Sequence, residues 1–394
     1  MARKQYAATH PVSTPLIQFV HAMRFWRTLL IPALVFTLSL EILQAQKKKH
    51  SDEEEETQTL ELPKDPPQAV AVAPQRLGFL TAPLTSKGLL SQQVRDGLKS
   101  LRKLARGAAI VKIRAFVAGT GDLRRVQAIV SDQFADWKQP LPALTTIQVG
   151  ALAQDGAQVL LEATTVEKKA VNPNGLAFFS GQRVTSKEAL EKIGPLFQQS
   201  LAQLRAALRG VNLEGPGVLR ATCFVSTLGD YADIRQSLAR EFPNAALTIV
   251  QTLRGLSQGL VECEAVGRAS RPPAAPLEPV NPPELSASPN YSQVMLMNAP
   301  KAVISGMQLA FNSQDADVRL AFERLRKAVE QAGATLANTA MTNYYPLTQS
   351  MVAKIRQIRF EFLDKKRPPA STMLPFEGLP SQDASFAMEV IALP

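Results

Sequence analysis

The stretch LPALTTIQVGALAQDGAQVLLEATTV, residues Leu141–Val166, decides the fold because the chain carries it three times. Its other copies are FPNAALTIVQTLRGLSQGLVECEAV from Phe242 and PPASTMLPFEGLPSQDASFAMEVIA from Pro368. Each copy has a proline-led run, a turn and a second apolar run that contains a glutamate. That glutamate follows the proline by 20, 21 and 20 residues, in Pro142–Glu162, Pro243–Glu264 and Pro369–Glu389. A spacing this constant indicates an internal repeat.

The agreement between the copies extends upstream of each proline. Every copy opens with a strand-like run, RLGFLTA, LAFFSGQ or KAVISGM, followed by a long amphipathic helix, a β-branched or aromatic run and a second helix. The order strand, helix, strand, helix, strand, strand predicts an α+β fold, a mixed sheet with its helices on one face. We expect three such domains, over residues 69–170, 171–270 and 290–394.

Three further segments surround these domains. Residues 271–289, RPPAAPLEPVNPPELSASP, are rich in proline and predict an extended polyproline II linker. Residues 47–68, KKKHSDEEEETQTLELPKDPPQ, predict a disordered charged linker. Residues 1–46 have the basic, apolar and small-residue regions of a signal peptide, with Met23 as an alternative start. This pattern predicts export to a periplasm or out of the cell; an uncleaved leader would instead hold the chain at the membrane.

Composition excludes several classes of function. The net charge is +10, but Lys and Arg are scattered along amphipathic helices, so we expect no nucleic-acid partner. All three histidines, His10, His21 and His50, precede the predicted domains, which excludes histidine-based nucleophilic catalysis and His-ligated metal sites there. Cys223 and Cys263 are too few for a zinc cluster, and form either one disulfide or two buried thiols. We expect neither a metal nor a cofactor.

The element order and three short motifs resemble the RidA/YjgF family of enamine and imine deaminases. The motifs are SGQ after the opening strand of the second copy, NYSQV with AVISG in the third, and the proline-led run followed by EA or EVIA. The resemblance implies a chorismate mutase-like fold and a trimer with ligand clefts between subunits. Three linked copies would then close an intramolecular pseudo-trimer in a monomeric chain; three independent domains are the alternative.

The residues that the family uses for chemistry are mostly replaced. The family arginine that clamps the substrate carboxylate corresponds to Leu144, Ala245 and Ser371. The glutamate that activates water corresponds to Leu160, Glu262 and Ala387, so Glu262 is the one candidate catalytic residue. Strand alternation places Glu262 and Glu264 on one face and Cys263 on the other. The candidate substrate-binding residues that the resemblance implies are Ser180, Glu264, Tyr291 and Ser305.

Two functions follow from this pattern. A composite cleft that joins Glu262 with Tyr291 and Ser305 would support an imine deaminase, with Lys366 or Arg367 replacing the lost arginine. Without any clamp, the chain is a degenerate, non-catalytic or weakly catalytic ring that binds a small molecule, an imine or a carboxylate. In that case the glutamates are structural charges satisfied between the copies. The missing arginines favour the second function.

Overall fold

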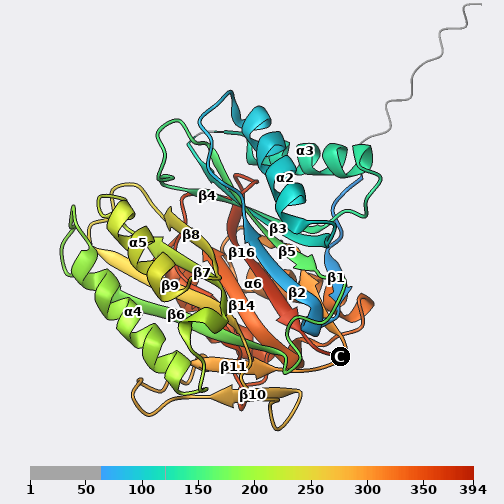
Figure 1. Ribbon diagram of the computed structural model, residues 1–394, viewed down its shortest axis with the longest axis vertical. Coiled ribbons are helices and arrows are strands. Elements are labelled where there is room, and N and C mark those ends of the chain that lie inside the picture. Colours follow the sequence, from blue (N-terminus) through green and yellow to red (C-terminus); the bar gives the residue numbers. More distant parts are fainter. Residues whose placement is uncertain (1–63, 120) are drawn as a thin grey trace, which may run out of the picture. The chain divides into compact units, whose positions relative to one another are not determined.

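The computed structural model describes residues 64–119 and 121–394 (Figure 1). The predicted signal peptide and most of the charged linker therefore lie outside the described residues. Within the described part no helix has the length and apolar character needed to cross a membrane. The strands of this part form three sheets.

The first sheet has the order β2-β5-β3-β4. Its opening strand follows a 3-10 turn, Pro74–Arg76. Helix α2 buries Val94, Leu98 and Leu101 on one face, at the spacing of helical turns. The elements are β2 (Leu77–Thr81), α2 (Leu90–Ala105), β3 (Ala109–Ala118), α3 (Leu123–Asp136), β4 (Ala143–Val149) and β5 (Val159–Val166).

The second sheet has the order β10-β11-β6-β9-β7-β8. Pro195 lies in the first turn of α4, where its missing N–H leaves no helical bond unmade. The elements are β6 (Leu176–Thr185), α4 (Gly194–Arg209), the 3-10 turn Gly215–Gly217, β7 (Val218–Val225), α5 (Tyr231–Glu241), β8 (Ala246–Gln251), β9 (Leu260–Arg268), β10 (Leu277–Val280) and β11 (Val294–Met297).

The third sheet has the order β1-β12-β16-β14-β15, and β13 also pairs with β16. Helix α6 begins with a capping box between Gln314 and Asp317, and Thr348 caps α7. The elements are β1 (Ala69–Val72), β12 (Ala302–Ser305), β13 (Gln308–Phe311), α6 (Asp315–Gln331), β14 (Thr339–Pro346), α7 (Gln349–Ile358) and β15 (Ala370–Met373), with β16 (Ala384–Ala392) and the 3-10 turns Leu336–Asn338 and Arg359–Glu361.

One pairing pattern occurs in all three sheets. A central strand pairs in parallel with the strand that follows its helix and antiparallel with the last long strand: β3 with β4 and β5, β7 with β8 and β9, β14 with β15 and β16. Each sheet packs one face on its own helices, whose apolar residues share a core with it. Figure 1 shows α2 with α3 and α4 with α5 flanking the strands between them. These observations confirm a mixed α+β architecture.

The other faces of the sheets pack against one another. Phe116 of β3, Phe224 of β7 and Tyr345 of β14 occupy matching positions and belong to one buried cluster with Phe376. Their rings meet edge to face, with centroids 5.2 to 6.2 Å apart. Burial on both faces explains why a run such as QVLLEATTV is apolar without strict alternation.

Two short strands, each at the start of a repeat, pair with a sheet that a different repeat forms. β1 pairs with β12 of the third sheet, and β11 pairs with β6 of the second. The predicted linker 271–289 is also not a simple spacer, because it contains β10, which pairs with β11. These short strands supply hydrogen-bond partners to sheet edges that would otherwise be unpaired.

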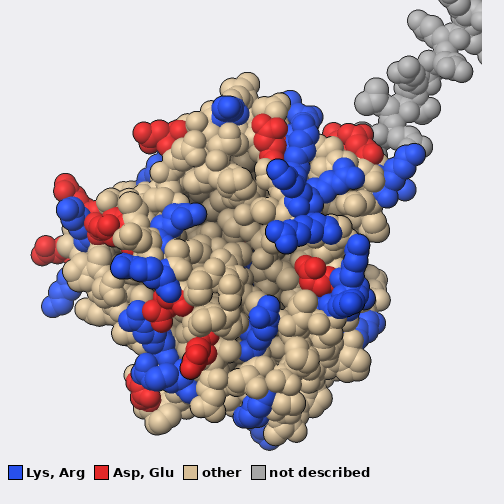
Figure 2. Space-filling view, in the orientation of Figure 1, with Lys and Arg blue, Asp and Glu red and all other residues tan. Residues whose placement is uncertain are grey.

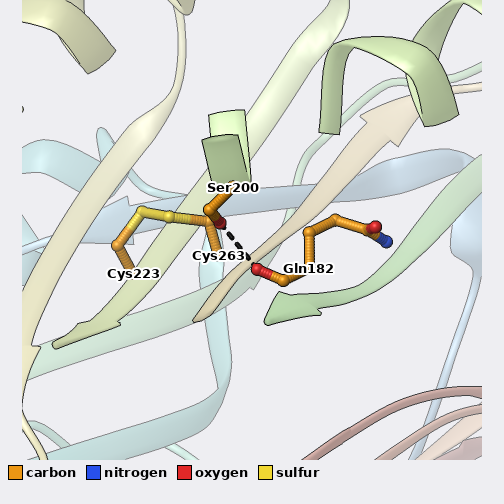
Figure 3. The surroundings of a disulfide bond; sticks show 4 residues. All are labelled: Gln182, Ser200, Cys223 and Cys263. Atoms are coloured by element: carbon orange, nitrogen blue, oxygen red, sulfur yellow. Dashed lines mark hydrogen bonds between the residues drawn. A yellow bond between two sulfur atoms is a disulfide. The ribbon is translucent and has the colours of Figure 1, made fainter. Parts of the chain in front are cut away.

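Cys223 and Cys263 form a disulfide that joins directly opposite residues of β7 and β9 (Figure 3). Beside it, Ser200 of α4 donates a hydrogen bond to the carbonyl of Gln182. Both cysteines belong to the helix-side core of the second sheet. Cys263 therefore lies on the face opposite Glu262 and Glu264, as strand alternation predicts.

Candidate functional site

A cavity of about 210 Å³ lies between the second and third sheets. We call it the Glu262 cleft. Its lining includes Arg183, Glu262, Tyr291, Arg356, Arg359 and Ser371. β6 and β9 supply Arg183 and Glu262, while α7, the turn that follows it and β15 supply Arg356, Arg359 and Ser371. The cleft is thus built from two sheets and the segment that leads into β11.

Glu262 is buried, with 3% of its surface exposed. Its carboxylate accepts a hydrogen bond from Arg183, which also donates to the carbonyl of Met373 in the other sheet. A Cβ at Gly181 would lie 2.2 Å from the Glu262 carboxylate, so any side chain at this position would force Glu262 to move. Burial raises the pKa of Glu262 above its ordinary value, and the opposing charge of Arg183 does not cancel this rise.

Arg356 and Arg359 bring positive charge to the opposite wall. Arg359 is only 2% exposed and donates to the carbonyl of Asn290 at 2.6 Å, while its Nε has no protein partner. Arg356 is exposed to solvent and lines the cleft. With Arg183, three guanidinium groups face the single carboxyl group of Glu262. The cleft therefore attracts anions.

Tyr291 and Ser371 complete the polar lining. Burial raises the pKa of Tyr291, and the nearby Glu262 carboxylate adds to the rise. The Ser371 amide donates to Ser180 Oγ at 2.8 Å, and this hydroxyl donates to the carbonyl of Ser292 at 2.6 Å. Ser180 is therefore engaged in joining the second and third sheets.

Ser305 and Glu264 do not join this cleft. The Ser305 hydroxyl accepts from the amide of Val390 at 2.9 Å, and its carbonyl accepts from Lys112 at 2.7 Å. The structure therefore brings Glu262 and Tyr291 of the predicted composite together and places Ser305 outside the cleft. The Ser305 side chain thus bonds within the third sheet, and its backbone carbonyl contacts the first sheet.

Glu264 belongs to a buried ion cluster where the three sheets meet. Glu162, Glu264 and Glu389 each oppose a central strand, across from Arg114, Thr222 and Asn343. Arg114 pairs with Glu162 at 2.6 Å and with Glu264 at 3.3 Å, and Lys112 pairs with Glu389 at 2.7 Å. Arg220 is the third cation and pairs with Glu264. Three carboxylates thus meet three cations, as expected for structural charges satisfied between copies.

Strand register corrects the position of the lost arginine in the second copy. Thr145, Thr248 and Thr372 lie opposite Arg114, Thr222 and Asn343, so the preceding residues, Leu144, Leu247 and Ser371, are equivalent. Ala245 is not the equivalent, because the segment before β8 is two residues longer than in the other copies. Thr248 follows Pro243 by five residues, whereas Thr145 and Thr372 follow their prolines by three. Ala245 and Leu247 also line a different cleft from Glu262. Ser371 is the position that faces Glu262.

The proposed replacement by Lys366 or Arg367 has no support in the geometry. Arg367 donates to the Asn338 side chain at 2.7 Å, and neither residue lines the Glu262 cleft. Sequence reasoning instead missed Arg183 and Arg359. The sequence did contain a signal for each. Arg183 follows the glycine of SGQ by two residues, and Arg359 follows Arg356 by three at the end of α7.

Residues 282–393 match the family model described as Endoribonuclease L-PSP. The match confirms the RidA/YjgF resemblance for the third copy. No curated protein matches the chain significantly. Solved structures that resemble parts of it include a Rid-family protein of unknown function from Yersinia pestis, with 16% identity, a TM-score of 0.27, and coverage of 30% of this chain and 100% of that one.

Two further solved structures are similar to parts of this chain. One is a member of the YjgF/YER057c/UK114 family from Mycobacterium tuberculosis, with 26% identity, a TM-score of 0.21, and coverage of 24% of this chain and 79% of that one. The other is RidA from an Antarctic Psychrobacter, with 20% identity, a TM-score of 0.21, and coverage of 24% and 80%.

Proposed function

We propose that this chain binds a small carboxylate, such as a 2-oxo or 2-imino acid, in the Glu262 cleft. The observation that carries the proposal is the excess of guanidinium groups in that cleft, where Arg359 keeps a buried Nε without a protein partner. Arginine suits this ligand because its planar fork can donate two parallel hydrogen bonds to a carboxylate. Arg356, on the exposed rim, is the group that meets the ligand first.

We also propose that the three repeated units are divergent RidA-like copies that close a pseudo-trimer within one chain. The thrice-repeated strand pairing and the shared ion cluster support this arrangement. Of the three clefts between the sheets in the described residues, the Glu262 cleft alone is lined by a buried glutamate and several arginines. The three clefts of the proposed ring therefore differ in their chemistry.

Weak imine hydrolysis is the second candidate, and the raised pKa of Glu262 favours it. The Glu262 carboxylate would take a proton from water as the water oxygen attacks the imine carbon. Protonation of the nitrogen and cleavage of the carbon–nitrogen bond would then release ammonia and the 2-oxo acid. The ion pair with Arg183 opposes this role because it occupies the carboxylate. We therefore place binding before catalysis.

Calorimetric titration of the full chain with 2-oxobutanoate tests the binding proposal. Arg356→Ala should weaken binding ~10- to 100-fold, the effect of losing hydrogen bonds to a charged group. Arg235→Ala is the matched control, because both arginines follow the buried isoleucine of their helix, Ile234 or Ile355, but line different clefts. An equal response of the two variants, or no binding by the folded wild type, contradicts the proposal.

Ammonia release from 2-iminobutanoate separates the two candidates. We expect little release from the wild type, and a higher rate from Ser371→Arg, which returns a guanidinium beside Glu262. Leu247→Arg places the same side chain at the equivalent position of another cleft and should have no effect. A robust wild-type rate that Glu262→Gln abolishes would make the Glu262 cleft a working deaminase site.

Export of the chain remains our proposal. The Cys223–Cys263 disulfide supports it, because such bonds persist in oxidising compartments and are rare in reducing ones. An intact mass of exported protein that still contains residues 1–46 would contradict cleavage of the leader.

A further inference from the structure

Three clefts occupy related places between the sheets, and their chemistry differs. Besides the Glu262 cleft, a cavity of about 300 Å³ lies between the third and first sheets, lined by Leu144 and Thr146. A third cavity, of about 610 Å³, lies between the first and second sheets, lined by Leu160, Leu247 and Ile249. We call this third cavity the Leu247 cleft.

Register shows how the Leu247 cleft relates to the Glu262 cleft. Leu160 opposes Phe116 as Glu262 opposes Phe224, and Leu247 is equivalent to Ser371. In the same way Ile249 opposes Cys223 as Met373 opposes Tyr344. The carboxylate of Glu262 and the hydroxyl of Ser371 are thus both replaced by leucine in the Leu247 cleft. The Leu247 cleft therefore lacks the residues that would activate water or recognise a small polar acid.

The size of the Leu247 cleft follows from the positions of the segments that lead into β1 and β11. The segment that leads into β11 contributes Ser288, Asn290 and Tyr291 to the Glu262 cleft. The segment that leads into β1 contributes 65–68 to the cleft between the third and first sheets. No leading segment lines the Leu247 cleft within the described residues, and the outer side of β2 carries no further strand. The cleft is therefore left wider than the other two.

One positively charged side chain lies on the rim of the Leu247 cleft. Arg235 of α5 lines the cleft, and in the described part of the chain no carboxylate lies within salt-bridge distance of it. Leu104 of α2, on the opposite rim, is 45% exposed although it is apolar. Figure 2 shows a hollowed, uncharged surface between α5 and α2, with Lys and Arg side chains on either side. An apolar floor beside an unpaired guanidinium matches a ligand with an apolar body and an anionic head.

We propose that the Leu247 cleft is a second binding site, for an amphipathic monoanion such as a medium-chain aliphatic carboxylate. The alkyl chain lies over Leu160, Leu247 and Ile249, and the carboxylate reaches Arg235. This site is independent of the small-acid site at Glu262, since the two share no lining residue.

Decanoate and decanol, titrated into the full chain by calorimetry, test this site. Decanoate should bind, and Arg235→Ala should weaken it ~10-fold or more through loss of a charge-assisted hydrogen bond. The same variant should leave decanol binding unchanged, since decanol has no charge to lose. Leu247→Asn should weaken both ligands because it places an amide against the alkyl chain.

Arg356→Ala is the matched control and should leave decanoate binding intact while it weakens 2-oxobutanoate. The two proposals can therefore fail separately. If decanoate does not bind to the folded wild type at up to ~1 mM, the second site is wrong. If Arg356→Ala removes decanoate binding and Arg235→Ala does not, the ligand occupies the Glu262 cleft and the proposal is overturned.

Discussion

At the scale of single residues, two buried carboxyl groups respond to their surroundings in opposite ways. Burial would raise the pKa of Glu389, but the charges of Lys112 and Arg114 and the Lys112 hydrogen bond outweigh burial and lower it to about 2. At Glu262 the charge of Arg183 is too weak to outweigh burial, and the pKa rises. The first group is held ionised as part of the structure, and the second keeps a proton more readily.

Stability in acid should follow Glu389. Because its folded pKa lies below the unfolded value of 4.5, its contribution is present above pH 4.5 and is lost as pH falls towards about 2. The shift corresponds to about 3 kcal/mol of unfolding free energy. Glu389→Gln should remove this dependence and destabilise the fold by ~3–5 kcal/mol at pH 7, because it leaves Lys112 buried without its partner.

Urea denaturation from pH 7 down to pH 2 measures this effect. Glu361→Gln, which removes an exposed ion pair with Arg319, is the control and should leave the transition nearly unchanged. A Glu389→Gln protein as stable as the wild type at pH 7 would show that the pair with Lys112 contributes nothing. Glu262 has the opposite sign: its contribution is present below pH 4.5 and is lost as pH rises through its folded pKa.

At the scale of elements, β1 and β11 hold the sheets together by pairing outside their own copies. Gly306 donates to the carbonyl of Gln68 at 2.7 Å, just beyond β1. Antiparallel alternation then directs the N–H of Val70 towards Ile304 in β12 and that of Ala71 away from it. Neighbouring residues of β1 therefore tolerate proline differently.

Val70→Pro should lower the free energy of unfolding by about 1–3 kcal/mol, because a buried carbonyl of β12 loses its donor. Ala71→Pro, its control, loses only a solvent-facing donor and should cost clearly less. Chemical denaturation of both variants measures the difference. Equal losses would mean that β1 does not pair with β12 in solution.

Local patterns predicted most elements but not their long-range partners. Helical periodicity identified α2 through Val94 and Leu98, and alternation placed Glu262 opposite Cys263, because both signals lie within one element. The pairing of β1 with β12, the contact of the Ser305 carbonyl with Lys112 and the approach of Arg356 to Glu262 depend on contacts between copies. A shift of two residues in the turn before β8 also displaced the lost arginine from Leu247 to Ala245 in the sequence comparison.

At the scale of the whole described unit, each sheet depends on its neighbours for buried area and for edge strands. A chain that ends before Asn290 would lack β11, and so expose the edge of β6 as well as the face that the third sheet covers. We expect the full chain to be a monomer and the truncated chain to aggregate or to pair with other chains. Light scattering after size exclusion measures both, and a truncated chain that stays monomeric with an unchanged melting temperature would contradict the ring.

The pairing of β1 with β12 also sets an order in time. More than two hundred residues separate Val72 from Ala302, so β1, the first strand of the described residues, cannot pair until most of the given sequence has been made. Such late contacts slow folding, since a long loop must close before they form. The chain therefore remains incompletely paired until late in its synthesis.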